Sequence, residues 1–102
     1  MFTQCAQQQQ VDFKVLAQQP GTIIVDVRTV EEFDAGHIPQ SINIPLHEIE
    51  EAVEYLEGYK NIIFICRSGN RSGQATTLFK ELGFEHVYNG GGWEEFQRLY
   101  LE

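Results

Sequence analysis

The residues with the clearest chemical potential form one short stretch, Cys66-Arg-Ser-Gly-Asn-Arg71-Ser72. It combines a thiol, whose anion is a strong nucleophile, with two guanidinium groups that stay charged at neutral pH. Positive charge and free backbone N–H groups both favour thiolate over thiol. The stretch therefore predicts an acidic cysteine that reacts with anionic substrates. The alternative is a buried, inert cysteine, but such a residue would need neither the arginines nor the glycine.

The segments on either side place this cysteine at the end of a strand. The run Asn61-Ile-Ile-Phe-Ile-Cys66 is apolar and rich in β-branched residues, which is typical of a buried strand. From Ser72 onward the apolar residues follow helical spacing, and Gly83 lies where a helix commonly ends. The loop therefore joins the carboxyl end of a strand to a helix, where α/β sheets bind their ligands.

The rest of the chain alternates between strand and helix patterns. Strands are expected at residues 22–27, 42–44 and 85–89, with a short edge strand at 2–5, and helices at 11–19, 29–35, 46–57 and from Trp93 onward. This alternation predicts an α/β domain with a mostly parallel central sheet. A length of 102 residues fits one domain, spanning 1–102.

Asp26 and Arg28 are alternate residues at the end of the expected strand 22–27, so they share one face. We expect Asp26 to accept hydrogen bonds from loop amides. We expect Arg28 to pair with Glu31 or Glu32, at the start of a helix that Thr29 and Glu32 cap. A structural role is the favoured interpretation of both residues, and direct catalysis by Asp26 is the alternative.

Composition excludes several function classes. The formal net charge of −8 argues against nucleic acid, and no apolar run is long enough for a membrane span. The two cysteines, Cys5 and Cys66, favour a reducing cytoplasm over a structural disulfide, with Cys5 a bystander. No histidine has metal-ligand spacing, and His37 is expected to bond to backbone. Salt screens the field of the exposed carboxylates over roughly 8 Å. The arginines and amides of the loop act at contact distance, so they can still attract an anion.

Four motifs together resemble the single-domain rhodaneses, the thiosulfate sulfurtransferases. They are the Cys66–Ser72 loop, Asp26-Val-Arg28, Gly36-His-Ile-Pro39 and Gly90-Gly-Gly-Trp93, although Gln40-Ser41 replaces the Gly-Ala that commonly follows the third. The resemblance implies a rhodanese-like fold with helices on both faces of the sheet, and no cofactor or metal.

The resemblance also implies a reaction. Cys66 would take a sulfane sulfur from thiosulfate or a related anionic donor, hold it as a persulfide, and pass it to cyanide or a thiol, including that of a protein. The residues expected to hold the donor and the persulfide are Arg67, Ser68, Gly69, Asn70, Arg71 and Ser72. Arg67 would guide the donor at the rim and Arg71 would close the loop, with Asp26 and Arg28 supporting it.

Two other functions stay open at this stage. Cysteine-dependent phosphatases and arsenate reductases use a similar loop, but the six residues from Cys66 to Arg71 are one fewer than theirs. A tighter ring suits a single sulfur atom better than a phosphoryl group. A non-catalytic rhodanese-like binding module is the second alternative, against which the presence of Cys66 counts. Nothing in the sequence indicates more than a monomer.

Overall fold

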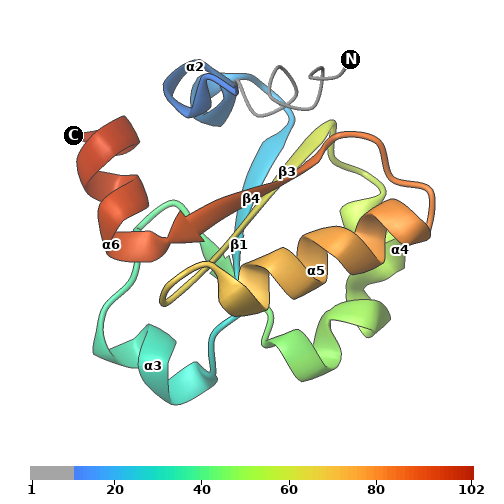
Figure 1. Ribbon diagram of the computed structural model, residues 1–102, viewed down its shortest axis with the longest axis horizontal. Helices are drawn as coiled ribbons and strands as arrows, with labels where there is room; N and C mark the ends of the chain where they lie inside the picture. Colours follow the sequence, from blue (N-terminus) through green and yellow to red (C-terminus); the bar gives the residue numbers. More distant parts are fainter. Residues whose placement is uncertain (1–10) are drawn as a thin grey trace, which may run out of the picture.

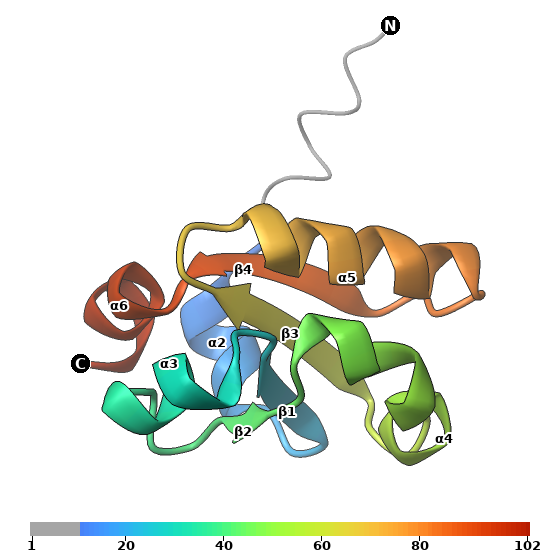
Figure 2. The same cartoon turned by 90° about the horizontal axis from the view of Figure 1, so that it is seen from below.

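The computed structural model describes residues 11–102 and contains a four-stranded parallel sheet (Figures 1 and 2). The strand order is β2-β1-β3-β4, with bounds Ile42–Asn43, Thr22–Asp26, Asn61–Cys66 and Val87–Gly92. Every neighbouring pair is parallel, which confirms the predicted fold class. The edge strand expected at residues 2–5, and Cys5 itself, lie outside the described residues.

Helices cover both faces of this sheet (Figure 2). One face carries the 3-10 helix η1 (Leu46–Ala52), α4 (Val53–Leu56) and α5 (Asn70–Glu81), and the other carries α2 (Phe13–Gln18), α6 (Trp93–Phe96) and the final turn η2 (Gln97–Leu101). The short helix α3 (Val30–Ala35) follows the carboxyl end of β1. No helix within residues 11–102 has both the length and the apolar character to cross a bilayer.

The central strand β3 is buried on both sides, which explains its continuous apolar run. Its alternate residues Ile62, Phe64 and Cys66 join the core under α5, while Ile63 and Ile65 join the core under α2 and α6. Burying side chains of this size contributes about 1.5–3 kcal/mol each. The strand is therefore a rigid support, and it directs the Cys66 side chain to the α5 face.

The structure differs from the sequence-based expectations in two elements. The helix expected over 46–57 is a 3-10 helix for its first seven residues. The last strand begins at Val87 and continues through the glycine run, although glycine usually weakens strands. Close packing explains the second difference, because a Cβ on Gly90 would lie 2.8 Å from the Ile63 side chain. Two leucines in segments with helical apolar spacing, Leu82 and Leu99, are exposed.

Candidate active site

Cys66 is the last residue of β3, and its side chain is buried at the base of the loop that leads into α5. Gly69 turns that loop with a φ of 103°, a left-handed conformation that favours glycine, and occupies the N-cap of α5. The turn directs the Gly69 N–H at the sulfur, with N and Sγ 3.0 Å apart. A strand end, a glycine turn and a helix N-terminus thus form a half-closed ring around Sγ.

The hydrogen bonds in this ring determine the acidity of the thiol. Burial raises the pKa of Cys66, but hydrogen bonds from the Ser72 hydroxyl and from the N–H groups of Ser72, Ser68 and Gly69 outweigh burial and hold the pKa below its usual value. The Ser72 Oγ lies 3.3 Å from Sγ, and Ser72 is fully buried. The donors are therefore the loop's own amides and one hydroxyl, whereas the sequence pointed to the two arginines as well.

Arg71 faces a carboxylate that the sequence assigned elsewhere. Its two terminal nitrogens donate to Glu32 of α3 at 2.7 and 3.0 Å. Glu32 also accepts from the Thr29 N–H in the predicted capping box, and these bonds lower its pKa from 4.5 to about 2. Arg71 thus joins the start of α5 to α3. The expected pairing of Arg28 with Glu31 or Glu32 is wrong.

Arg28 instead pairs with Asp26, two residues earlier on the same strand face. Its Nε and Nη2 donate to the fully buried Asp26 carboxylate at 2.8–3.0 Å, and the Arg28 N–H donates to it as well. The guanidinium also donates to the Gly36 carbonyl at 2.7 Å and lies 4.7 Å from the centre of the Trp93 ring. The pair thus joins β1 to α3 and α6, and Asp26 is left no free carboxylate edge for proton transfer.

Asn89 of β4 is a site residue that sequence reasoning missed. Its Oδ1 accepts from the Ser72 hydroxyl at 2.7 Å and from the Gly91 N–H at 3.0 Å, and its Nδ2 donates to the Gly69 carbonyl at 3.1 Å. The signal was an asparagine at the end of the strand expected at 85–89, directly before three glycines. β4 therefore braces the Cys66 loop from the side opposite α3.

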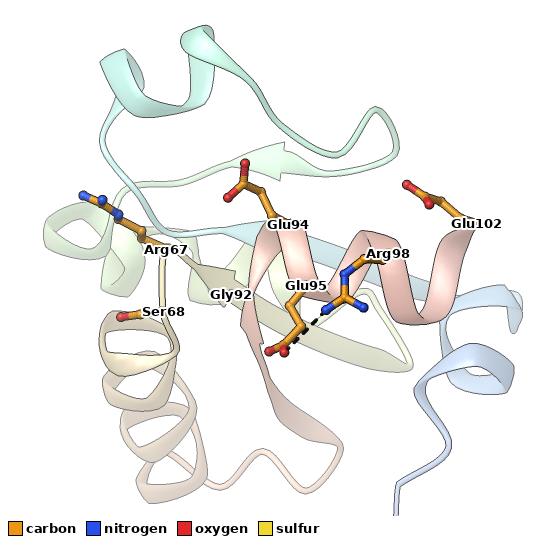
Figure 3. A pocket seen from close by; sticks show the side chains of 7 residues that line it. All are labelled: Arg67, Ser68, Gly92, Glu94, Glu95, Arg98 and Glu102. Atoms are coloured by element: carbon orange, nitrogen blue, oxygen red, sulfur yellow. Dashed lines mark ion pairs between the residues drawn. The ribbon is translucent and has the colours of Figure 1, made fainter.

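The exposed loop residues border open space. A cavity of about 630 Å³ is lined by Arg67, Ser68, Gly92, Glu94, Glu95, Arg98 and Glu102. Figure 3 shows the Glu95 and Arg98 side chains pointing at each other across an ion pair of 3.7 Å. Arg67 also lines a second cavity of about 220 Å³, with Trp93 and Glu32. Arg67 thus lines both cavities, whereas the Asn70 side chain accepts from Gln74 on the helix surface.

Two further predictions concern histidine and metal ions. The His37 ring lies 2.7 Å from the Phe33 carbonyl oxygen, which confirms the expected bond to backbone. Among residues 11–102, no group of three or more His, Cys, Asp or Glu side chains is arranged to hold a metal ion.

The chain is similar in sequence and in fold to known proteins. Residues 9–99 match the family model of the rhodanese-like domain. The chain is 37% identical to the thiosulfate sulfurtransferase PspE of Escherichia coli, covering 70% of each chain. It is 42% identical to Bacillus subtilis YrkF, to which a sulfur-carrier role is ascribed, over 65% of this chain, and it spans only 36% of that longer protein. A solved Escherichia coli rhodanese with anions superposes with a TM-score of 0.67 at 36% identity, over 72% of this chain and 89% of that one.

Proposed function

The chain belongs to the rhodanese-like domain family, and on this basis we propose that it is a sulfurtransferase that carries a sulfane sulfur on Cys66. One observation carries the proposal. Donors from the loop and from α5 converge on a single buried sulfur, with the Gly69 N–H at 3.0 Å and the Ser72 Oγ at 3.3 Å. Such a ring stabilises one anionic sulfur without any second charged group in contact with it.

The first half-reaction uses this ring to prepare the nucleophile. The Cys66 thiolate attacks the outer sulfur of thiosulfate, a new S–S bond forms, and the old S–S bond breaks with its electron pair leaving on sulfite. The product is a persulfide whose negative charge lies on the terminal sulfur, one atom farther from the strand. Arg67 at the rim attracts the dianionic donor, and the N–H groups of Ser68 and Gly69, which donate to Sγ, would also donate to the transferred sulfur.

The second half-reaction returns the thiolate. A nucleophile such as cyanide or a thiolate attacks the terminal sulfur, and the bond between the two sulfurs breaks with its electron pair returning to Sγ. The same donors that lowered the pKa of Cys66 now stabilise the leaving group. A reducing compartment such as the cytoplasm is part of this proposal, because only reduced Cys66 starts the cycle.

Intact-mass analysis tests the proposal. The protein is incubated with thiosulfate, and we expect the mass of one added sulfur atom, absent in Cys66→Ser and removed by cyanide. The matched control is Ser41→Ala, which removes another buried hydroxyl, bonded to the Ile38 carbonyl, and should leave the adduct unchanged. No adduct with thiosulfate or with an alkanethiosulfonate anion, RSO2S⁻, which also carries a sulfane sulfur, would contradict sulfur transfer.

A second arm separates sulfur chemistry from phosphate chemistry. The loop from Cys66 to Arg71 directs its donor at one sulfur and leaves little space for three phosphoryl oxygens. The charge of Arg71 is already paired with Glu32, so it is not available to them either. We expect negligible turnover of aryl phosphates. Phosphate release that depends on Cys66, without a persulfide, would instead assign the cysteine-dependent phosphatase class. If neither a persulfide nor released phosphate is formed, the chain would be assigned as a binding module.

A further inference from the structure

Ser72 has a single hydroxyl proton and two partners for it. Its Oγ lies 2.7 Å from Asn89 Oδ1 and 3.3 Å from Cys66 Sγ, and the residue is fully buried, so water cannot supply another proton. Asn89 and the sulfur can therefore not both accept from this hydroxyl at the same time. Which of them does so depends on the charge of the sulfur.

The orientation of the Asn89 amide is fixed by two backbone groups. The Gly91 N–H can only donate, so it requires the oxygen of the amide, at 3.0 Å. The Gly69 carbonyl can only accept, so it requires the nitrogen, at 3.1 Å. With Oδ1 thus facing Ser72, the hydroxyl must donate to Asn89. The thiol S–H then donates to Ser72 Oγ, because that oxygen has no second proton to give.

We propose that Asn89 is a positioning residue for sulfur transfer. It accepts the hydrogen bond of the Ser72 hydroxyl while Cys66 is a thiol, and the hydroxyl turns to donate to Sγ instead when the thiolate forms. The proposal rests on the proposed function for its role in the cycle. In the thiolate, Sγ no longer donates and becomes the stronger acceptor, so the hydroxyl turns toward it. Asn89 keeps its bonds to the Gly91 N–H and the Gly69 carbonyl, so the loop stays braced while the proton turns.

The fold places Asn89 for this task. It is paired with Phe64 across β3 and β4, one register step before an irregularity between Phe64 and Ile65. Asn89 shares with its partner Phe64 the α5 face, where Cys66 also lies, and Gly90, the extra residue at the irregularity, packs closely on β3. Gly73 of α5 leaves room for it, since a Cβ there would lie 3.2 Å from Asn89 Nδ2.

The proton shift supports both half-reactions. When thiosulfate is attacked, the hydroxyl has already turned to Sγ and stabilises the nucleophile. When the persulfide forms, charge leaves Sγ for the terminal sulfur, and the hydroxyl can return to Asn89 Oδ1. When an acceptor removes that sulfur, the electron pair returns to Sγ and the hydroxyl donates to it again. Ser72 contacts the reacting atom, whereas Asn89 acts through Ser72.

Charged groups on the elements around the loop must be kept constant in any pH test. They are Asp26 of β1, Arg28 just after it, Glu32 of α3, Glu94 of α6, Arg67 of the loop, and Arg71 in the first turn of α5. None is an imidazole or an amine. The alanine substitutions at Asn89 and Ser72 change none of them, so a shift in thiol titration reports on the hydrogen bonds.

The test is a double-mutant cycle on the pKa of Cys66. The pKa is measured from the rate at which a neutral reagent alkylates Cys66 as the pH is varied. The four proteins are the native chain, Asn89→Ala, Ser72→Ala and the double variant. Asn89→Ala should lower the pKa by about half a unit to one unit, because the Ser72 proton loses its competing acceptor. Ser72→Ala should raise it, and in that background Asn89→Ala should not lower it.

A merely structural Asn89 would give the opposite sign. Losing the brace would misalign the loop amides, so Asn89→Ala would then raise the pKa with or without Ser72. A raised or unchanged pKa in Asn89→Ala overturns the proposal. Asn89→Asp provides a second reading should the alanine variant fail to fold. Its carboxylate accepts more strongly from the Ser72 hydroxyl. Asn89→Asp should therefore raise the pKa of Cys66 by more when Ser72 is present than in the Ser72→Ala background, and equal rises overturn the proposal.

Alkylation needs no sulfur donor, so this test is independent of the proposed function. If thiosulfate gave no persulfide while the cycle showed the expected signs, sulfur transfer would fail and the proton arrangement would stand. If the persulfide formed and the signs were wrong, only the role of Asn89 would fail.

Discussion

The two central strands end side by side, and each places a buried polar group at the same edge of the sheet, on opposite faces. Asp26 at the end of β1 pairs in register with Ile65, the residue before Cys66 at the end of β3. Both side chains are buried, at 0% and 1% exposure. Burial therefore does not distinguish the residue that we propose to be structural from the one that we propose to be reactive.

The difference lies in the partners. The Asp26 carboxylate is bound by one full positive charge and a backbone N–H, all fixed within three residues of chain. Among residues 11–102 no cation contacts the Cys66 sulfur, and its donors are loop amides and a hydroxyl with a choice of acceptor. The first arrangement is complete and resists change, whereas the second can follow a negative charge from one sulfur to the next. Substitutions at the two strand ends should therefore separate activity from stability.

The largest expected effect on activity comes from Cys66→Ser. Because no other described residue offers a thiol, transfer of sulfur from thiosulfate to cyanide should fall to background, with the urea midpoint almost unchanged. Cys5→Ser is the matched control and should retain full activity. Comparable loss of activity in the Cys5 variant would contradict the assignment of Cys66 as the only carrier.

The largest expected effect on stability comes from Asp26→Asn. Removing one charge of a buried pair leaves the other uncompensated, which costs about 3–5 kcal/mol. The free energy of unfolding from urea titration should fall by that amount, while the protein that remains folded keeps Cys66 chemistry. Native stability combined with lost sulfur transfer would instead support direct catalysis by Asp26.

The sequence predicted the contacts between residues that are near each other in the chain and missed those between distant residues. The Cys66 loop, the cap of α3 and the shared face of Asp26 and Arg28 depend on neighbours within a few residues, and the sequence predicted all three. The partners of Arg71 and Ser72 are Glu32 and Asn89, 39 and 17 residues away. Side-chain pairing over such distances depends on strand order and on the irregularity in β4, which hydrophobic pattern does not encode.

Glu32 tests the link between the loop and α3. Glu32→Gln keeps an acceptor for the Thr29 N–H but removes the charge facing Arg71, so we expect a loss of about 0.5–1 kcal/mol at neutral pH. The folded pKa of Glu32 is lowered from 4.5 to about 2, so its contribution is fully present above pH 4.5 and is lost as pH falls toward 2. The difference in urea midpoint between the native and Gln proteins should shrink over that range. A difference that stayed constant to pH 2 would contradict the ion pair.

The smallest expected effect sharpens the account of thiol acidity. Arg71 is paired with Glu32, and its attraction to the Cys66 thiolate is a smaller influence on the thiol than the hydrogen bonds, of which those from Ser72 lower the pKa of Cys66 most. Arg71→Met should therefore raise the pKa of Cys66 by less than about half a unit, less than Ser72→Ala does. Alkylation rates across pH measure both shifts, and Lys80→Met, an exposed cation at the far end of α5, is the control for net charge. A shift from Arg71→Met as large as that from Ser72→Ala would show that charge at a distance, and not the ring of amides and hydroxyl, makes this thiol acidic.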